Sequence, residues 1–305
     1  MATNRKKILV LMGGKSRERS ISIQSGHACF NVIKKLGYLT YKFDPISQID
    51  KNIKKINPDV VFNCLHGKYG EDGEIQKILE KLKIPYTHSG IKSSQNAMDK
   101  IKSKKLFLKN KIKTPNYKFI KKISDLDNNI SRFKFIIKPV NEGSSLGVEI
   151  FEKISKPNIK KIKKLLKKYK SLIQETFIEG KEIQTAVVGN KAIGSVEITP
   201  TRKFYDFKAK YLSSAKTIHT IPPRIPQKIH SKVKKIALKA HKILKCKGVT
   251  RSDFRVTKNG LIYILEINTQ PGMTKLSLVP EIAMKHGMNF KKLVSWMIKD
   301  AGIKR

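Results

Sequence analysis

The sequence predicts an α/β protein whose C-terminal part is α+β. Short apolar runs alternate with amphipathic helical stretches near the N-terminus, which is typical of a small parallel sheet. Later apolar strands follow one another through short turns, as in antiparallel sheets. The 305 residues are enough for two or three domains of about 100–150 residues. A hydrophobic content of 39%, spread along the chain, argues against disorder.

The first elements build the parallel sheet. Strands are predicted over 8–12, 60–62 and 84–86, and helices over 22–36 and 72–82, from their apolar spacing. Ligands on parallel sheets bind at the carboxyl ends of the strands, where two glycine-rich loops fall. One loop contains Glu18, which could hold an ammonium group, although a tight turn with a helix cap is the simpler interpretation. The other contains His66, for which structural and functional roles are equally open.

A lysine-rich helix is predicted over 97–109, and the pattern then changes to strands at 133–139 and 148–151. Between these strands, the loop 140–147 has two glycines and two serines, whose backbone N–H groups could lie over phosphates. It lacks the GKS/T and the following helix of a Walker P-loop, and an ordinary hairpin loop is the alternative. Lys138 strengthens the phosphate interpretation, because an unpaired charge is costly in its apolar segment.

Two more strands are predicted within 182–196, joined at Gly189-Asn190. The stretch 204–224 is polar and irregular, and it is a candidate active-site loop or lid. A helix over 227–244 then leads to a hairpin over 253–267.

This hairpin carries the strongest chemical signal. Asn259-Gly260 predicts a two-residue type I′ turn, which pairs Asp253 with Glu266 and Arg251 with Asn268. Period-2 alternation puts all four side chains on one face. Two carboxylates and an amide oxygen suit Mg²⁺, and Arg251 beside them could stabilise developing negative charge. A solvated face with cross-strand polar pairs is the alternative.

The net charge of +42 suggests a nucleic-acid or membrane partner. The basic residues are 56 Lys and 9 Arg, and the lysines are scattered, whereas proteins that read nucleic acids depend on arginine. We therefore attribute the excess to a residue bias. The helix over 159–169 has an all-lysine polar face, as on a membrane surface, but we expect its apolar stripe to pack on a core. No apolar run reaches the roughly 20 residues of a membrane helix.

Three widely spaced cysteines without a CxxC indicate a reduced, cytoplasmic protein.

Taken in order, the motifs resemble the D-alanine–D-alanine ligase family of the ATP-grasp superfamily over essentially the full length. They are Gly13-Gly14-x-Ser16-x-Glu18, His66-Gly67-x-x-Gly70-Glu71-Asp72-Gly73, Met98-Asp99-Lys100, Glu142-Gly143-Ser144-Ser145-x-Gly147, Ala209-Lys210-Tyr211, and Asn268-Thr269-x-Pro271-Gly272-Met273-Thr274 followed by Ser277-Leu278-Val279-Pro280. Each motif is weak alone, and all of them in this order are specific. The resemblance implies an ATP-grasp fold with an N-terminal Rossmann-like domain (1–93), a central nucleotide-clamping domain (94–180) and a C-terminal domain with the metal and catalytic residues (181–305).

The resemblance implies ATP-dependent joining of two D-alanine molecules through an acylphosphate, for peptidoglycan precursor synthesis. By position, the resemblance implies that the two D-alanines are bound by Glu18, in a hydrogen-bonded triad with Ser145 and Tyr211, and by His66, Ser277 and Leu278. It implies that the oxyanion is held by Arg251 and the Gly272 N–H, and that two Mg²⁺ (or Mn²⁺) ions are held by Asp253, Glu266 and Asn268. The residues that it implies for the nucleotide are Lys100, Lys138, Lys210, Ser144, Glu175, Ile178 and Glu182. Family members that prefer D-lactate carry Phe at the position of Tyr211, so Tyr211 favours D-alanine.

We also expect a homodimer with no specific nucleic-acid or membrane partner. One alternative is another ATP-grasp carboxylate–amine ligase with a different amino acid. The other is a basic nucleic-acid-associated protein, which would have no reason to gather Asp253 and Glu266 on one face.

Overall fold

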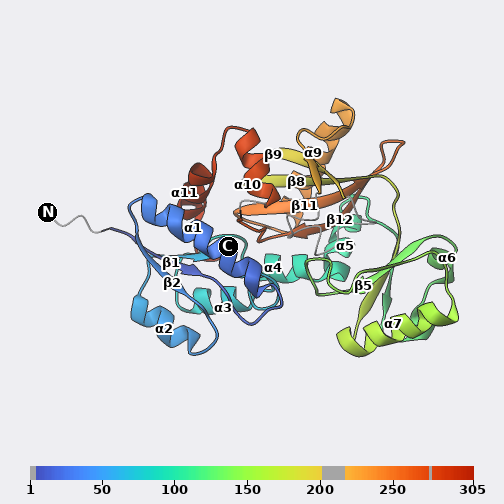
Figure 1. Cartoon of the computed structure of the whole chain (residues 1–305), viewed down its shortest axis with the longest axis horizontal. Helices are drawn as coiled ribbons and strands as arrows, with labels where there is room; N and C mark the ends of the chain where they lie inside the picture. Colours follow the sequence, from blue (N-terminus) through green and yellow to red (C-terminus); the bar gives the residue numbers. More distant parts are fainter. Residues whose placement is uncertain (1–4, 201–216, 275–276) are drawn as a thin grey trace.

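The structure, a computed structural model, describes residues 5–200, 217–274 and 277–305 (Figure 1). Its named strands form three sheets, of three, five and four strands. The N-terminal elements lie at one end and the four-stranded sheet at the other, with the five-stranded sheet between them (Figure 1). Among the described residues, no helix is long and apolar enough to cross a membrane.

The N-terminal sheet is parallel, as predicted, with the strand order β2-β1-β3. Its strands and the helices that follow them are β1 (Lys7–Leu11), α1 (Arg19–Lys35), β2 (Leu39–Phe43), α2 (Ile49–Ile56), β3 (Val60–Asn63) and α3 (Glu74–Lys81). The sequence prediction missed β2, whose residues are mostly exposed and form no apolar run. It also made a strand of 84–86, where only Tyr86 forms isolated bridges, to Val61 and Gly302.

The four-stranded sheet is antiparallel, with the order β4-β7-β5-β6. Its elements are β4 (Tyr117–Ile120), the short helices η1 (Ile123–Asp125) and α6 (Asn128–Ser131), β5 (Phe135–Pro139), β6 (Glu149–Phe151), α7 (Lys156–Tyr169) and β7 (Leu172–Thr176). Helix α7 corresponds to the helix predicted over 159–169, whose polar face is all lysine. Its Ile162 is buried and packs in the core of this sheet with Leu165 and Leu166, as expected for an amphipathic helix.

The five-stranded sheet is antiparallel, with the order β10-β9-β8-β11-β12. Its elements are β8 (Lys181–Val188), β9 (Lys191–Thr199), β10 (Ile218–Thr220), α9 (Gln227–Ile243), β11 (Val249–Val256) and β12 (Ile262–Asn268), and two helices follow them, α10 (Leu278–Lys285) and α11 (Phe290–Asp300). The predicted joint at Gly189-Asn190 is confirmed, because β8 ends and β9 begins on either side of it.

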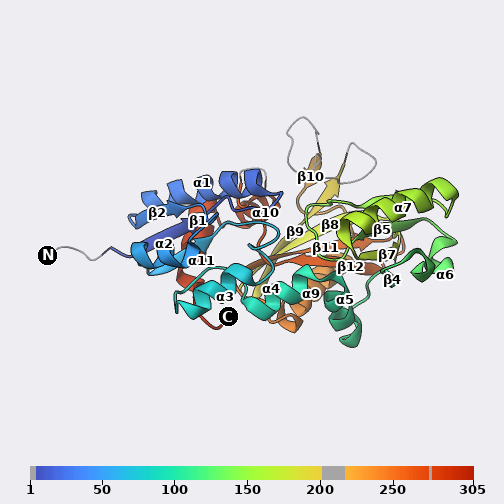
Figure 2. The same ribbon diagram turned by 90° about the horizontal axis from the view of Figure 1, so that it is seen from below.

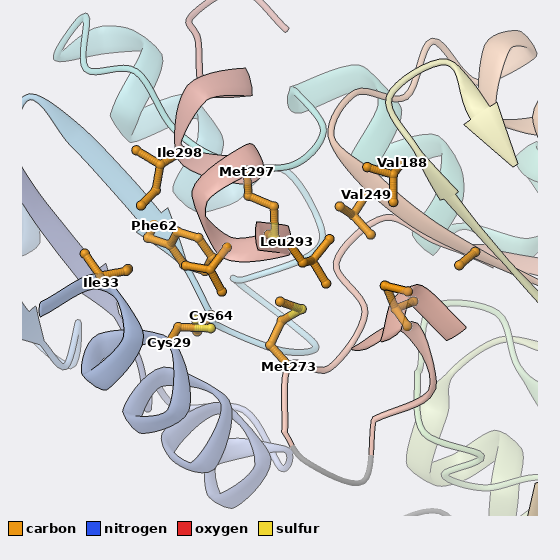
Figure 3. Packing of buried hydrophobic residues seen from close by; sticks show 14 of the residues in the cluster. Cys29, Ile33, Phe62, Cys64, Val188, Val249, Met273, Leu293, Met297 and Ile298 are labelled. Carbon is orange, nitrogen blue, oxygen red and sulfur yellow. The ribbon is translucent and has the colours of Figure 1, made fainter. Parts of the chain in front are cut away.

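The N-terminal and C-terminal parts share one hydrophobic core. Phe62 of β3 and Ile33 of α1 belong to the same buried cluster as Leu293 and Met297 of α11 and Val249 of β11 (Figure 3). Packing of residues so distant in sequence fixes the first sheet against the last one. The loops at the ends of β1 and β3 are therefore held at a defined position relative to β11 and β12.

The predicted helix 97–109 is two helices, α4 (Ile91–Met98) and α5 (Lys100–Lys109). Asp99 separates them, because its backbone is extended and its carboxylate accepts hydrogen bonds from the N–H groups of Ile101 and Lys102, at 3.0 Å each. The sequence analysis overlooked this N-cap. Figure 2 shows α4 and α5 running from the N-terminal part toward the four-stranded sheet, and the cap fixes Lys100 at the joint between them.

Candidate active site

Two adjoining pockets contain most of the predicted site residues. The β7 pocket lies between the four-stranded and five-stranded sheets, and its predicted members are Lys100, Lys138, Ser145, Glu175, Ile178, Glu182, Asp253 and Glu266. The α1 pocket lies beside the start of α1, and its predicted members are Glu18, His66, Lys100, Ser144, Arg251, Glu266, Asn268 and Gly272. Lys100, Glu142, Gly143 and Glu266 line both pockets. The two pockets therefore meet at Lys100, at Glu266 and at the start of the loop 140–147, which we call the glycine-serine loop.

Glu175 is the buried centre of the β7 pocket. Its two carboxylate oxygens lie 3.2 Å from Lys104 Nζ and 3.0 Å from Lys138 Nζ. Burial acts to raise the pKa of the Glu175 carboxyl, but the two ammonium groups outweigh it and hold that pKa below its usual value. Lys138 therefore does have the partner that its apolar segment demands, and it comes from the neighbouring strand β7.

A second ion pair lines the β7 pocket. Glu182 of β8 faces Arg255 of β11 in the sheet register, and Arg255 donates a 3.0 Å hydrogen bond to it. The Arg255 guanidinium also lies over the ring of Phe177, 5.8 Å from its centroid. Phe177, Ile178 and Ile136 supply apolar wall between the charged ends. A flat apolar ligand with anionic and hydroxyl groups would match this lining.

Glu18 is buried at the start of α1 and reaches across to the glycine-serine loop. Ser144 donates a short hydrogen bond to Glu18 Oε1. A Cβ on Gly67 would come within 2.6 Å of Glu18 Oε2, and the φ of 68° at this position favours glycine. The family resemblance implied a hydrogen-bonded triad of Glu18 with Ser145 and Tyr211. In the structure it is Ser144 whose bond to Glu18 is seen, while Ser145 lines the β7 pocket and Tyr211 lies outside the described residues.

The glycine-serine loop also has a strained backbone. Ser144 and Ser145 are both in the left-handed region, with φ of 50° and 59°. Holding a non-glycine residue in this conformation costs about 1–3 kcal/mol, and such residues are found most often at functional sites. The conformation lets the neighbouring hydroxyls enter different pockets, Ser144 toward α1 and Ser145 toward β7.

His66 is held by a hydrogen-bond relay in the α1 pocket. One ring nitrogen, Nδ1, lies 3.0 Å from Glu71 Oε1, and the other, Nε2, lies 3.3 Å from Ser25 Oγ. Ser25 Oγ in turn accepts a 3.1 Å hydrogen bond from the Met273 N–H. His66 thus connects the loop after β3 with the loop after β12, where Gly272 lies.

The hairpin β11–β12 places its four polar residues opposite one another as predicted. Asp253 pairs with Glu266 and Arg251 with Asn268. Arg251 donates to both carboxylate oxygens of Asp253, at 2.8 and 2.9 Å. Lys100 Nζ lies 3.5 Å from Glu266 Oε2 and donates a 2.6 Å hydrogen bond to the Glu142 carbonyl. Cations from two elements therefore balance these carboxylates.

The turn of this hairpin, however, was wrongly predicted. Thr257 and Leu261 close a three-residue loop, in which Gly260 takes the left-handed conformation (φ 75°) and Asn259 does not. This loop shifts the nearby pairs by one residue, so that Phe254 faces Ile264. A β-bulge at Leu265 then restores the predicted register at Glu266. The two departures cancel at the site.

The side chains at the hairpin fit divalent metal ions in their donor chemistry. Asp253 and Glu266 supply carboxylate oxygens and Asn268 an amide oxygen, the donors that Mg²⁺ prefers. Within residues 5–200, 217–274 and 277–305, no group of three or more His, Cys, Asp or Glu side chains is placed to hold a metal. The hairpin supplies two carboxylates and an amide, so it falls outside that definition. Its carboxylates already pair with the cations Arg251 and Lys100.

The remaining predicted residues lie elsewhere. Lys210 falls outside the described residues. Leu278 is 5% exposed and belongs to the core shared with α1, and it lines neither pocket. Ser277 is close to the α1 pocket without lining it, since a Cβ on Gly272 would lie 2.8 Å from its Oγ.

The sequence analysis missed three residues that support the site. Lys104 and Arg255 hold Glu175 and Glu182, and Gln270 bonds the Leu65 carbonyl and, at 2.7 Å, the Asn63 side chain. Arg255 could have been found, because it lies two residues beyond Asp253 on the same face. Lys104 has the i+4 spacing to Lys100 that marks a common helix face, but the lysine excess concealed it.

The chain matches two family models, one described as the D-ala D-ala ligase N-terminus over residues 39–89 and one as the D-ala D-ala ligase C-terminus over 106–299. A D-alanine–D-alanine ligase of Pelagibacter ubique is 52% identical to it, over 98% of this chain and 99% of the relative. One of Wolbachia pipientis is 44% identical, over 96% and 94%.

Solved structures agree. A crystal structure of D-alanine–D-alanine ligase from Bacillus anthracis has a TM-score of 0.86 and 34% identity, covering 97% of both chains. The structure of that ligase complexed with ATP has a TM-score of 0.84 and 31% identity, over 97% of both chains.

Proposed function

Since this chain belongs to the D-alanine–D-alanine ligase family, we propose that it joins two D-alanine molecules in an ATP-dependent reaction that supplies peptidoglycan synthesis. The observation that supports this most is the meeting of the β7 and α1 pockets at Lys100 and Glu266. A nucleotide in one pocket and an amino acid in the other would bring a phosphate and a carboxylate together there. Held in that geometry, the two reactants gain the large rate advantage of proximity.

In the first step, a carboxylate oxygen of one D-alanine attacks the γ-phosphorus of ATP, and ADP leaves as an acylphosphate forms. Both reactants are anionic, so cations must bring them together. We assign Lys100 and Lys138 to the nucleotide phosphates, with Ser144 and Lys210 near them. Glu175, Ile178 and Glu182 are assigned to the adenine and ribose, on the apolar wall of the β7 pocket.

Glu18 is assigned to the ammonium group of the first D-alanine. A buried carboxylate is the natural partner of an ammonium group, and His66 orients this end of the α1 pocket through its contacts with Glu71 and Ser25. The triad of Glu18 with Ser145 and Tyr211 remains a proposal, because Tyr211 lies outside the described residues.

In the second step, the amine of another D-alanine attacks the acyl carbon. The tetrahedral oxyanion collapses, the carbon–oxygen bond to phosphate breaks, and the amine loses a proton. We assign the oxyanion to Arg251 and the Gly272 N–H, which both line the α1 pocket. Ser277 and Leu278 are proposed to approach the second D-alanine. Of these two, Leu278 is buried and lines neither pocket in this structure.

We assign Asp253, Glu266 and Asn268 to two Mg²⁺ or Mn²⁺ ions. Such ions neutralise phosphate charge as it develops. Arg251 donates one hydrogen bond to each oxygen of Asp253, and the remaining lone pairs of this carboxylate could bind a metal ion.

We further propose the three-domain division 1–93, 94–180 and 181–305, because each of the three sheets falls within one of these ranges. The free, buried cysteines accord with a reduced cytoplasmic location. A homodimer is supported by β2, an edge strand of the first sheet with exposed Leu39 and Tyr41.

The deciding experiment measures phosphate release from ATP and Mg²⁺ with D-alanine, and compares it with L-alanine and with D-lactate. We expect release with D-alanine, a D-alanyl-D-alanine product, and little release with the other two. Equal release with all three, or release without any of them, would contradict the proposal. Light scattering of the purified protein tests the dimer.

A further inference from the structure

Lys104 is a lysine with no exposed surface, which is rare because burying an ammonium group is costly. Its Nζ donates a 2.6 Å hydrogen bond to Thr114 Oγ1 and lies 3.2 Å from Glu175 Oε1. Thr114 in turn donates to the carbonyl of Ile264 on β12, at 2.8 Å. The ring of Tyr117 closes the other side, with its centroid 5.6 Å from Nζ. The ammonium group is therefore anchored.

Lys104 shares its carboxylate with a second lysine. Glu175 lies between Lys104 and Lys138, so that the buried cluster holds two cations and one anion and has an excess of one positive charge. A buried charge in excess is unfavourable on its own. An anionic ligand beside the cluster would compensate it.

The two lysines differ in what they can reach. Lys138 and Glu175 line the β7 pocket, whereas Lys104 lines neither pocket and is enclosed by α5, β4, β7 and the segment before β4. Lys138 can turn toward a bound ligand without breaking any other bond described for its ammonium group. Lys104 has no such path, since its Nζ is tied to Thr114.

We propose that Lys104 is a positioning residue, the resident counter-ion of Glu175 that lets Lys138 leave this carboxylate and bind a nucleotide phosphate. This inference rests on the proposed use of ATP in the β7 pocket. When Lys138 turns to the phosphates, Glu175 keeps one cation and stays ionised and in place. Without Lys104, Lys138 would be the remaining cation on Glu175, and a buried ion pair of that kind is strongly held.

The test compares Lys104→Met with Lys105→Met, which removes the same charge from an exposed position of the same helix. Calorimetry measures the affinities for ATP and for adenosine, which lacks phosphates. A lost charge-assisted contact weakens ATP binding of Lys104→Met by about tenfold or more, and adenosine binding by less than about threefold. Lys105→Met changes neither affinity. The KM for ATP rises in Lys104→Met, while the KM for D-alanine does not.

Equal weakening of ATP and adenosine binding, or unchanged ATP binding, would overturn the proposal. If Lys104→Met fails to fold, the same substitution is made in Glu175→Gln, where no charged carboxylate holds Lys138. In that background it weakens ATP binding by less than about threefold, and a tenfold loss there would refute the counter-ion role. If the unaltered protein binds neither ATP nor adenosine, it is the proposed function that fails.

Discussion

The β7 pocket and the α1 pocket treat their carboxylates differently. In the β7 pocket each acid is matched with a cation of the wall: Glu175 with Lys138, Glu182 with Arg255, and Glu266 with Lys100, while the enclosed Lys104 also pairs with Glu175. In the α1 pocket, Glu18 accepts a hydrogen bond from the Ser144 hydroxyl, and His66 is the partner of Glu71. Lys138 and Arg255 line the β7 pocket and not the α1 pocket, so these two cations can face phosphates only there. The two pockets thus share Lys100 and Glu266 and differ in the charged side chains around them.

Glu266 belongs to both pockets, so its loss should have the largest effect. Glu266→Gln removes a charge while keeping the shape, and we expect kcat to fall by about 10³-fold, as when a group that stabilises transition-state charge is removed. Circular dichroism should show an unchanged fold. Glu152→Gln is the control, because Glu152 is exposed and pairs with Lys134 on the outer surface. Substantial activity in Glu266→Gln would contradict the metal assignment.

The enclosed Lys104, which pairs with Glu175, should be visible in the pH dependence of stability. Burial lowers the pKa of Lys104 to about 8, whereas in the unfolded chain this pKa is near 10.4. Between these values the unfolded chain binds more protons, so Lys104 makes the free energy of unfolding rise with pH from about 8 to about 10.4, by roughly 3 kcal/mol. Below pH 8 both states are protonated and this contribution is constant.

Urea unfolding of the unaltered protein, Lys104→Met and Lys105→Met across this range isolates the effect, because the other lysines titrate in all three. The rise should be missing from Lys104→Met and present in Lys105→Met. A parallel pH profile in all three proteins would show that the Lys104 pKa is not lowered.

A substitution at Glu18 tests the role of the α1 pocket separately from that of the β7 pocket. Glu18→Gln removes the charge that we assign to the D-alanine ammonium group, and we expect kcat/KM for D-alanine to fall by about 30-fold, near 2 kcal/mol. The affinity for ATP should stay the same, because Glu18 does not line the β7 pocket. Glu74→Gln, an exposed carboxylate paired with Lys77, is the matched control. A parallel loss of ATP affinity would mean that the pockets are not separable.

Contacts within one hairpin and contacts between distant segments differ in how well the sequence predicts them. The pairs Asp253–Glu266 and Arg251–Asn268 were predicted correctly, because alternation and a recognisable hairpin carry that information locally, although the pairs nearer the turn are shifted by one residue. Pairings across elements were not predicted: Lys104 with Glu175, His66 with Ser25, and Gln270 with Asn63 join segments whose contact depends on the tertiary fold. Exposed β2 and the Asp99 cap were missed for the opposite reason, since their signals are short and weak.

The hairpin turn gives the smallest predicted effect and tests why the register was right. A type I′ turn would need positive φ at both Asn259 and Gly260, whereas the three-residue loop needs it at Gly260, where φ is 75°. Gly260→Ala should therefore lower the free energy of unfolding by about 1 kcal/mol, and Asn259→Ala by less than about 0.5 kcal/mol. Urea unfolding of both variants measures this. Equal losses of unfolding free energy in the two variants would favour the two-residue turn, which needs no bulge at Leu265 to pair Asp253 with Glu266. Unequal losses mean that the bulge is what brings Glu266 opposite Asp253, because without its extra residue the three-residue loop would turn the Glu266 side chain to the other face.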